Sequence, residues 1–163
     1  LSFLVASSFS KSFSLYGERV GSLHVVCGDA DEALRVQSQL KVSARTNYSN
    51  PPTHGGKVVA TVLNDDGLRA QWETELSAMR ERIASMRVGL VTALKHAGVT
   101  APIAFIARQR GMFSYSGLSA AQMQRLRSEF GVYGVDSGRI CVAALNDANL
   151  PRVAAAVAAV MKA

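Results

Sequence analysis

The sequence predicts a mixed fold, in which an α/β part is followed by a smaller α+β part, and three observations support this prediction. Short apolar runs typical of strands are interspersed with segments of helical periodicity. One unusually long helical segment occupies residues 66–97. Beyond residue 98 the elements become short, and no internal repeat occurs along the 163 residues.

The N-terminal elements lie on either side of a serine-rich loop. Residues 1–6 form an apolar run that predicts a strand leading into this loop, and residues 22–27 alternate as a second strand that Gly28 ends. Acidic residues at 29–32 favour the start of a helix, because they complement the positive end of the helix dipole. This helix should cover about 31–44.

A turn at residues 50–52 separates that helix from a short apolar helix at 56–63, and the longest helix of the chain follows. The long helix should run from Asp66 to about Ala97, which corresponds to about 48 Å at ~1.5 Å per residue. Its apolar residues recur at spacings of three and four: Leu68, Trp72, Leu76, Met79, Ile83, Met86, Leu90 and Leu94. Such a stripe is also typical of a coiled-coil seam or an ordinary core face, so by itself it assigns no function.

The C-terminal elements are shorter. Apolar runs predict strands at residues 103–106, 112–115 and 139–143. Ser119 and Gln122 have the spacing of a capping box, which predicts a helix that continues to about Glu129. Asn149 should cap a C-terminal helix that accommodates Pro151 in its first turn.

The composition argues against several classes of function. The chain carries 18 Lys and Arg against 12 Asp and Glu, but the basic residues are scattered among the acids, which argues against a nucleic-acid partner. No apolar run is long enough to cross a bilayer and no signal-peptide pattern occurs, so we expect a cytoplasmic protein without a membrane partner. Cys27, Cys141 and the three histidines lack the spacing of metal ligands, so no metal site is assigned.

Residues 8–21 (SFSKSFSLYGERVG) combine groups that would bind an aldehyde and a phosphate. Lys11 follows Ser8 and Ser10, and Arg19 lies further along the same segment. A lysine amine must be neutral to attack a carbonyl, and a neighbouring cation favours the neutral form. Serine hydroxyls and a guanidinium donate hydrogen bonds to a phosphate dianion. The cofactor that combines both groups is pyridoxal 5'-phosphate, although a lysine in a serine-rich loop is more often a solvated surface residue.

The pattern Ser-x-Ser-Lys-x-Phe-x-x-Tyr-x-Glu-Arg-x-Gly in this segment resembles the lysine signature of the class I aminotransferases. These are the aspartate and aromatic aminotransferases among the fold type I pyridoxal-phosphate enzymes. Three further segments resemble the same family in the same order, namely 45–55 (RTNYSNPPTHG), 109–118 (QRGMFSYSGL) and 130–139, where FGVY leads into SGR. The resemblance therefore covers the whole chain.

This resemblance implies that the chain is the C-terminal portion of a longer enzyme. Residues 1–78 would complete the large cofactor-binding domain, residues 79–163 would form the small α+β domain, and the long helix would join them. The family's residues that pair with the pyridine nitrogen and stack on the ring would lie upstream. The implied protein partners are this missing N-terminal portion and a second copy of the chain, in a homodimer with composite active sites.

The family's cofactor-binding residues match four positions of this chain. By resemblance, Lys11 is the catalytic lysine, which binds pyridoxal 5'-phosphate and moves a proton during the reaction. Ser8, Ser10 and Arg19 would anchor the phosphate group of the cofactor.

The substrate-binding residues implied by the resemblance lie further along the chain. Arg139 would clamp the substrate α-carboxylate in a bidentate pair, although without the resemblance it would be assigned to the surface. Arg45 would reach the active site of the other subunit and pair with the distal carboxylate of a dicarboxylic substrate. Phe113 would lie near the substrate, and Ser49 and Asn50 would contribute to the shared site across the dimer.

The function implied is transamination between an aromatic amino acid or aspartate and 2-oxoglutarate. The segments that begin at Gly111 and Arg139 are closer to the bacterial aromatic (tyrosine) aminotransferase branch. Arg45 permits dicarboxylates, so aspartate aminotransferase stays an alternative. A chain that truly lacked the upstream half would instead be a non-catalytic fragment that binds the cofactor phosphate or forms dimers.

Overall fold

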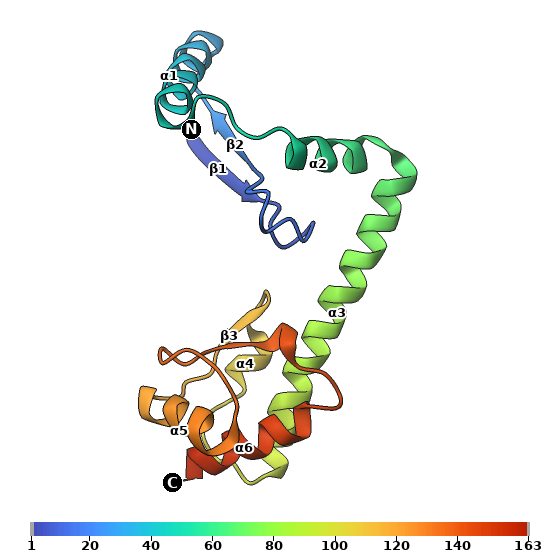
Figure 1. Ribbon diagram of the computed structural model, residues 1–163, viewed down its shortest axis with the longest axis vertical. Coiled ribbons are helices and arrows are strands. Elements are labelled where there is room, and N and C mark those ends of the chain that lie inside the picture. The colour runs from blue at the N-terminus through green and yellow to red at the C-terminus, as the bar shows by residue number, and fades with distance from the viewer. Residues whose placement is uncertain (1, 163) are drawn as a thin grey trace. The chain divides into compact units, whose positions relative to one another are not determined.

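Strands and helices occur in both parts of the chain, as Figure 1 shows for a computed structural model that describes residues 2–162. The mixed α/β content predicted from the sequence is therefore confirmed. The chain divides into two compact units between Leu76 and Ser77. The assignment of residues 1–78 and 79–163 to two domains of an enzyme stays a prediction.

The first unit begins with an antiparallel pair of strands, β1 (Phe3–Ser8) and β2 (Gly21–Val26). Ser8 is paired with Gly21 in the register of this ladder. Glycine is needed there, because a Cβ at position 21 would lie 2.5 Å from the carbonyl oxygen of Ser7. The ladder thus holds the two ends of the intervening serine-rich loop side by side.

Helix α1 (Ala30–Tyr48) begins at a capped acidic turn, as predicted. The Asp29 carboxylate accepts a hydrogen bond from the Glu32 amide at 2.7 Å. The helix ends at Ser49, whose amide still donates to the carbonyl of Arg45 at 3.2 Å. It extends beyond the predicted end because its last turn contains no glycine or proline.

Helix α2 (His54–Asn64) packs at its start against the serine-rich loop. Gly55 permits this approach, since a Cβ at that position would lie 2.7 Å from the Cβ of Glu18 and would also collide with Val20. Nδ1 of His54 lies 3.1 Å from a carboxylate oxygen of Glu18, which adds a polar contact at the same place.

Helix α3 (Asp66–His96) has 31 residues, and its predicted bounds are confirmed within a residue. Its apolar stripe is buried along the C-terminal half only, where the buried residues are Met86, Arg87, Leu90, Val91 and Leu94. In the other half Leu68 is 42% exposed, and Met79 is 44% exposed. The stripe therefore acts as a core face mainly inside the second unit.

The second unit contains a small antiparallel ladder of β3 (Phe113–Tyr115) and β4 (Arg139–Cys141). Its other elements, besides α3, are α4 (Phe105–Arg108), α5 (Ala120–Phe130), the 3-10 helix η1 (Val142–Ala144) and α6 (Leu150–Lys162). These helices bury one apolar core, whose largest fully buried members include Leu90, Leu94, Ile106, Met123, Leu126 and Val160.

The predicted capping box of α5 is confirmed. The Ser119 hydroxyl accepts from the Gln122 amide at 3.3 Å, and the Gln122 side chain accepts from the Ser119 amide at 2.9 Å. Asn149 directly precedes α6, as predicted, and its carbonyl accepts from the amide of Val153 at 3.0 Å. Its side chain accepts from the amide of Asn146 at 2.8 Å and donates to the carbonyl of Ala144 at 3.0 Å, which stabilises the preceding turn.

The strand predicted at residues 103–106 is wrong, because a turn and helix α4 occupy this segment. Ile103 and Ile106 are both buried, and the amide of Ile106 donates to the carbonyl of Ile103 at 3.1 Å. In a helical turn, two apolar residues three positions apart face the same core, and a short apolar run does not distinguish this case from a strand. The strand predicted at residues 139–143 ends early, at Cys141, where η1 begins.

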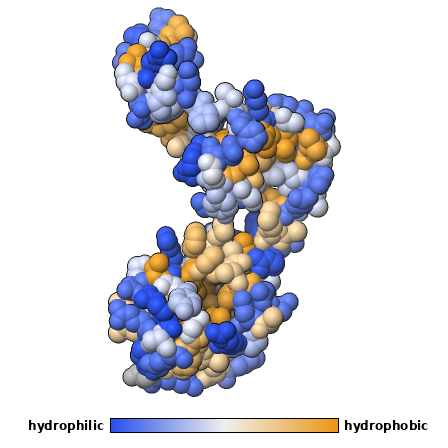
Figure 2. Space-filling model, viewed as in Figure 1, coloured by the Kyte–Doolittle hydropathy of each residue, from blue (hydrophilic) through white to orange (hydrophobic). Residues whose placement is uncertain are grey.

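Apolar surface is visible on both units in the space-filling view of Figure 2. Large exposed apolar side chains of the first unit include Phe3, Leu4, Val5, Leu23, Val26, Leu34 and Val42. They lie on both strands of the first ladder and on α1, a helix without any buried residue. Among the described residues, no helix has both the length and the apolar character that a membrane span requires.

Candidate active site

The serine-rich loop between β1 and β2 is closed by its own backbone. The amide of Phe9 donates to the carbonyl of Val20, and the amide of Phe13 donates to the carbonyl of Phe9, both at 3.0 Å. The first of these bonds continues the register of the ladder past its last strand pair. Residues 8 and 19, at the two ends of the loop, are therefore held near one another.

Two serine side chains meet at the base of this loop. The Ser8 hydroxyl donates to the Ser10 hydroxyl at 3.2 Å and accepts from the Ser10 amide at 3.3 Å. Ser10 is buried, with 3% of its surface exposed, whereas Ser8 is exposed. The pair thus places two hydroxyl groups in one small cluster.

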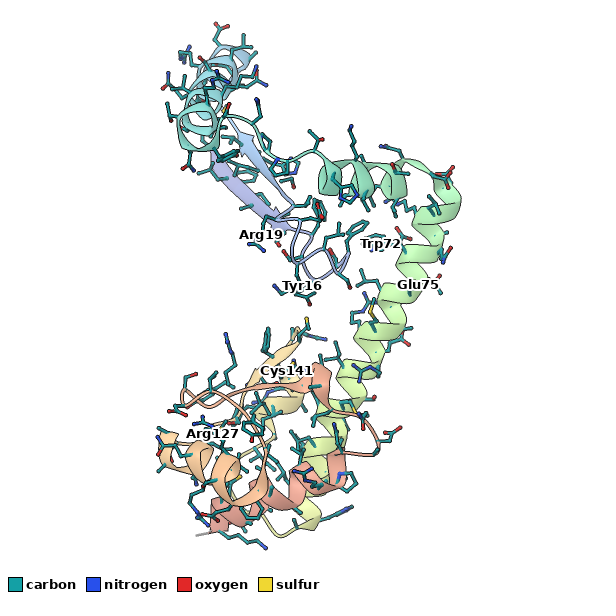
Figure 3. All side chains as sticks on the ribbon, in the orientation of Figure 1. Tyr16, Arg19, Trp72, Glu75, Arg127 and Cys141 are labelled. Carbon is teal, nitrogen blue, oxygen red and sulfur yellow. The ribbon has the colours of Figure 1, made fainter. Side chains whose placement is uncertain are left out.

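Lys11 follows this cluster and is exposed. Its Nζ atom lies over the ring of Tyr16, 5.0 Å from the ring centroid, which is within the range of a cation–π contact. The loop therefore turns back so that the amine and the aromatic ring face each other; Figure 3 labels Tyr16 and Arg19 in this loop.

Arg19 adopts a left-handed backbone conformation, with φ of 54°. Its Nη1 donates to the carbonyl of Tyr16 at 3.0 Å. Within residues 2–162 this is the single recorded hydrogen bond of the Arg19 side chain, so most of its guanidinium N–H groups stay available. A non-glycine residue in this conformation costs about 1 kcal/mol, and such strain is often found at functional sites.

Trp72 on helix α3 contacts the serine-rich loop, and the sequence did not predict these contacts. Its indole Nε1 donates to the carbonyl of Ser12 at 2.8 Å. Its ring stacks on Phe13 with centroids 4.7 Å apart, and Phe13 in turn contacts Phe9 edge-on at 5.6 Å. The sequence signal for these contacts is a tryptophan near the exposed end of an apolar stripe, because a half-buried indole N–H needs a hydrogen-bond acceptor.

Arg45, Ser49 and Asn50 lie together at the C-terminal end of α1. The Arg45 guanidinium donates to the Ser49 hydroxyl at 2.9 Å, and all three residues are exposed. They line an open depression of about 550 Å³ together with Lys41, Val42, Ala44, Thr46 and Pro51. No recorded contact joins these three residues to Lys11 within the described part of the chain.

Arg139 and Phe113 meet on the outer face of the second ladder. Arg139 is paired with Tyr115 in the register, and Phe113 with Cys141, so these four side chains share one face. The Arg139 guanidinium carbon lies 4.9 Å from the centroid of the Phe113 ring. This stacking fixes the guanidinium without using its hydrogen-bond donors.

Arg87 lies on the other side of that ladder and is the second residue that sequence reasoning missed. It is 2% exposed and donates to the Ser114 hydroxyl and to the carbonyls of Gly111 and Phe113, the last at 3.0 Å. Burial lowers the pKa of the Arg87 guanidinium below its usual range. Its position next to Met86 on a buried helix face is a weak sequence signal of a specific partner, because an arginine is rarely buried without one.

The described residues contain no group of three or more His, Cys, Asp or Glu side chains that could hold a metal ion. The polar groups of the loop between β1 and β2 are instead an amine, hydroxyls and a guanidinium. This set is suited to bind anions and a carbonyl compound.

Comparisons with known proteins agree with this chemistry. The family model described as aminotransferase class I and II matches residues 1–157. An aspartate aminotransferase from Pseudomonas aeruginosa is 58% identical over 161 residues, which are 99% of this chain and 40% of the relative. An aromatic-amino-acid aminotransferase from Escherichia coli is 58% identical over 158 residues, which are 97% of this chain and 40% of the relative.

A solved structure is similar over the same extent. The aromatic-amino-acid aminotransferase from Burkholderia pseudomallei, which is covalently bound to pyridoxal phosphate, matches with a TM-score of 0.95 and 63% sequence identity. The match covers 99% of this chain and 40% of that structure. The chain thus spans about 40% of the length of the relatives that it matches.

Proposed function

The chain belongs to the aminotransferase class I and II family, and we propose that it forms the C-terminal part of a pyridoxal-phosphate-dependent aminotransferase. The proposed reaction moves an amino group between an aromatic amino acid or aspartate and 2-oxoglutarate. The observation that carries the proposal is the closed loop that gathers Ser8, Ser10, Lys11 and Arg19. The family expected from the sequence motifs is confirmed.

The residues of this loop fit the cofactor in their chemistry. Ser8 and Ser10 offer hydroxyl groups for a phosphate group, and Arg19 of the same loop keeps guanidinium donors available. Lys11 offers an amine at the loop surface. When bound, pyridoxal phosphate supplies an electron sink that stabilises negative charge at the substrate Cα. In the proposed reaction, Nζ of Lys11 would accept the proton from the substrate Cα and would deliver it to carbon C4' of the bound cofactor.

The second unit supplies the proposed substrate contacts. Arg139 binds the α-carboxylate, because the stacked Phe113 ring holds its guanidinium in place and no hydrogen bond to another described residue occupies its donors. A fixed carboxylate orients the Cα–H bond, which increases the rate of proton transfer. Arg45, with Ser49 and Asn50, binds the distal carboxylate of a dicarboxylic substrate in the active site of the partner subunit.

Two further features support an assembly larger than this chain. The first ladder and α1 expose many apolar side chains, and none of the residues of α1 is buried. Burial of such surfaces is the usual driving force for domain and subunit association. We propose that the upstream part of the enzyme and a second subunit cover them, in a cytoplasmic homodimer.

The substrate preference is proposed from the sequence segments at 111–122 and 139–146, which favour aromatic amino acids. Relatives named for aspartate and for aromatic amino acids are equally similar, at 58% identity each. Aspartate aminotransferase is therefore the second candidate, and Arg45 is the observation that favours it. The ratio of kcat/KM for tyrosine to that for aspartate distinguishes the two.

Covalent labelling tests the central residue of the proposal. The enzyme of full family length is loaded with pyridoxal phosphate, reduced with borohydride and digested, and the modified peptide is identified by mass spectrometry. We expect the label on Lys11, and none on Lys57 or Lys95, which serve as internal controls. Label on either control lysine, or an unmodified Lys11 in cofactor-saturated enzyme, would contradict the proposal. Arg19 should still bind the cofactor non-covalently in a Lys11→Ala variant that has lost turnover.

A further inference from the structure

Arg87 is a buried cation without a carboxylate partner among the described residues. Removing a charged group from water is costly unless hydrogen bonds replace the lost hydration. An apolar residue would fill a core position on α3 at lower cost. We therefore expect the guanidinium at this position to have a role that depends on its planar array of hydrogen-bond donors.

The acceptors of Arg87 all belong to one short segment. Nη1 donates to the Ser114 hydroxyl, and Nη2 donates to the carbonyls of Gly111 and Phe113. Ser114 is itself 2% exposed, so its hydroxyl has no access to water as an alternative partner. Arg87 thus fixes the segment that enters and forms β3, at both backbone and side-chain atoms.

The register of the ladder connects this segment to the substrate side. Side chains alternate along β3, so Ser114 points to the inner face, where Arg87 lies, while Phe113 and Tyr115 point to the outer face. Arg139 is paired with Tyr115 and stacks on Phe113. The inner contact with Arg87 and the outer stack with Arg139 therefore act on adjacent residues of the same strand.

We propose that Arg87 is a positioning residue for the substrate carboxylate, acting through β3 to set the place of Phe113 and Arg139. This inference rests on the proposed function, since it takes Arg139 to be the carboxylate clamp. The planar fork of Arg87 holds three acceptors at fixed relative positions, which a lysine ammonium or an apolar side chain does not do. A shift of β3 moves the ring beneath the Arg139 guanidinium and changes the geometry of the bidentate pair.

The test uses the enzyme of full family length, loaded with cofactor, and 3-phenylpropionate as the probe. This compound has the carboxylate that Arg139 is proposed to bind and no amino group, so it cannot undergo transamination. Its dissociation constant is measured by calorimetry for Arg87→Met, Arg87→Lys and Arg139→Ala, together with the steady-state KM and kcat for phenylalanine. We expect Arg87→Met to weaken probe binding and raise KM by on the order of tenfold, with a smaller change in kcat, because hydrogen bonds from a charged group are lost. Arg87→Lys should restore little, since it keeps the charge and loses the fork.

Arg82 provides a matched control on the same helix. It also donates to two backbone carbonyls of the second unit, those of Ala143 and Leu145, both at 2.8 Å. Its acceptors lie after β4 and outside the segment that Arg87 holds. Arg82→Met should lower the melting temperature and leave the affinity for 3-phenylpropionate unchanged.

A double-mutant cycle decides whether Arg87 acts through Arg139. If it does, the variant with both Arg87→Met and Arg139→Ala binds the probe as weakly as Arg139→Ala alone. Fully additive losses, or an Arg87→Met variant that is less stable but has unchanged probe affinity, overturn the inference while the proposed function stands. Unchanged affinity in Arg139→Ala overturns both. If Arg87→Met does not fold, Ser114→Ala removes one acceptor of the same fork and carries the same expectation in milder form.

Discussion

The Lys11 loop should loosen when Trp72 loses its indole N–H. Trp72→Phe removes the 2.8 Å hydrogen bond to the Ser12 carbonyl and keeps an aromatic ring against Phe13. A neutral hydrogen bond contributes about 0.5–1.5 kcal/mol, and the half-buried position of Trp72 favours the lower part of this range. Trp72→Leu also removes the ring stacking, which contributes a further ~0.5–1.5 kcal/mol. We therefore expect losses of about 0.5–1 kcal/mol for the first variant and about 1–2.5 kcal/mol for the second.

Hydrogen exchange of the loop amides measures this loss directly. The amide of Phe13, which donates to the Phe9 carbonyl at 3.0 Å, reports opening of the loop. A loss of 1 kcal/mol corresponds to about fivefold faster exchange when the loop opens locally. Leu68→Ala is the control, because Leu68 lies one turn earlier on α3 and is 42% exposed. It should leave the exchange rate of the Phe13 amide unchanged.

Two results would refute this reasoning. Unchanged exchange at residues 9–20 in Trp72→Leu would show that the loop is held by its own backbone bonds and by the contact of α2. Equal acceleration at β3 and in the loop would show that Trp72 supports the whole chain and not this loop in particular.

Two further predictions concern the substrate arginines. Arg139→Ala should lower kcat/KM by about 100-fold or more for every substrate, because all substrates share the α-carboxylate. Arg45→Ala should lower kcat/KM for aspartate, glutamate and 2-oxoglutarate and should spare phenylalanine. Equal losses for both classes of substrate in Arg45→Ala would contradict the assignment. Lys11→Ala and Arg45→Ala subunits should each lack dicarboxylate activity, and mixing them should restore roughly a quarter of it after random exchange. About half of the dimers are then mixed, and one of their two sites receives both wild-type residues. No recovery after verified exchange would place Arg45 in its own subunit's site or outside any site.

The elements that the sequence predicted well are those with local signals. The capping box of Ser119 and Gln122 is made by residues three positions apart, and the start of α1 depends on Asp29 and Glu32 in the same way. Both signals lie within a single turn of chain, so they act regardless of the tertiary structure. The bounds of α3 follow from a periodic pattern long enough to exclude a strand.

The contacts that the sequence did not predict are long-range or depend on burial. Trp72 bonds to Ser12, which is 60 residues away in the chain, and Arg87 bonds to Ser114, which is 27 residues away. No local sequence pattern predicts such pairs, because the partners come together only after the units have folded. The strand prediction at residues 103–106 was wrong for a related reason. Its apolar residues are compatible with a helical turn as well as with a strand, and only the position of the core distinguishes the two.

Three arginines of this chain show how the surroundings assign different roles to one residue type. A guanidinium that binds a substrate carboxylate must keep at least two donors free and must also stay in one place. Arg87 meets only the second condition, because its guanidinium is buried and three of its donors bond to the β3 segment. Arg45 meets the first, and within residues 2–162 its side chain makes one hydrogen bond, to Ser49, which can open when a carboxylate arrives. Arg139 meets both, since the Phe113 ring holds its face while its edge stays open, so it is suited to the group that every substrate shares.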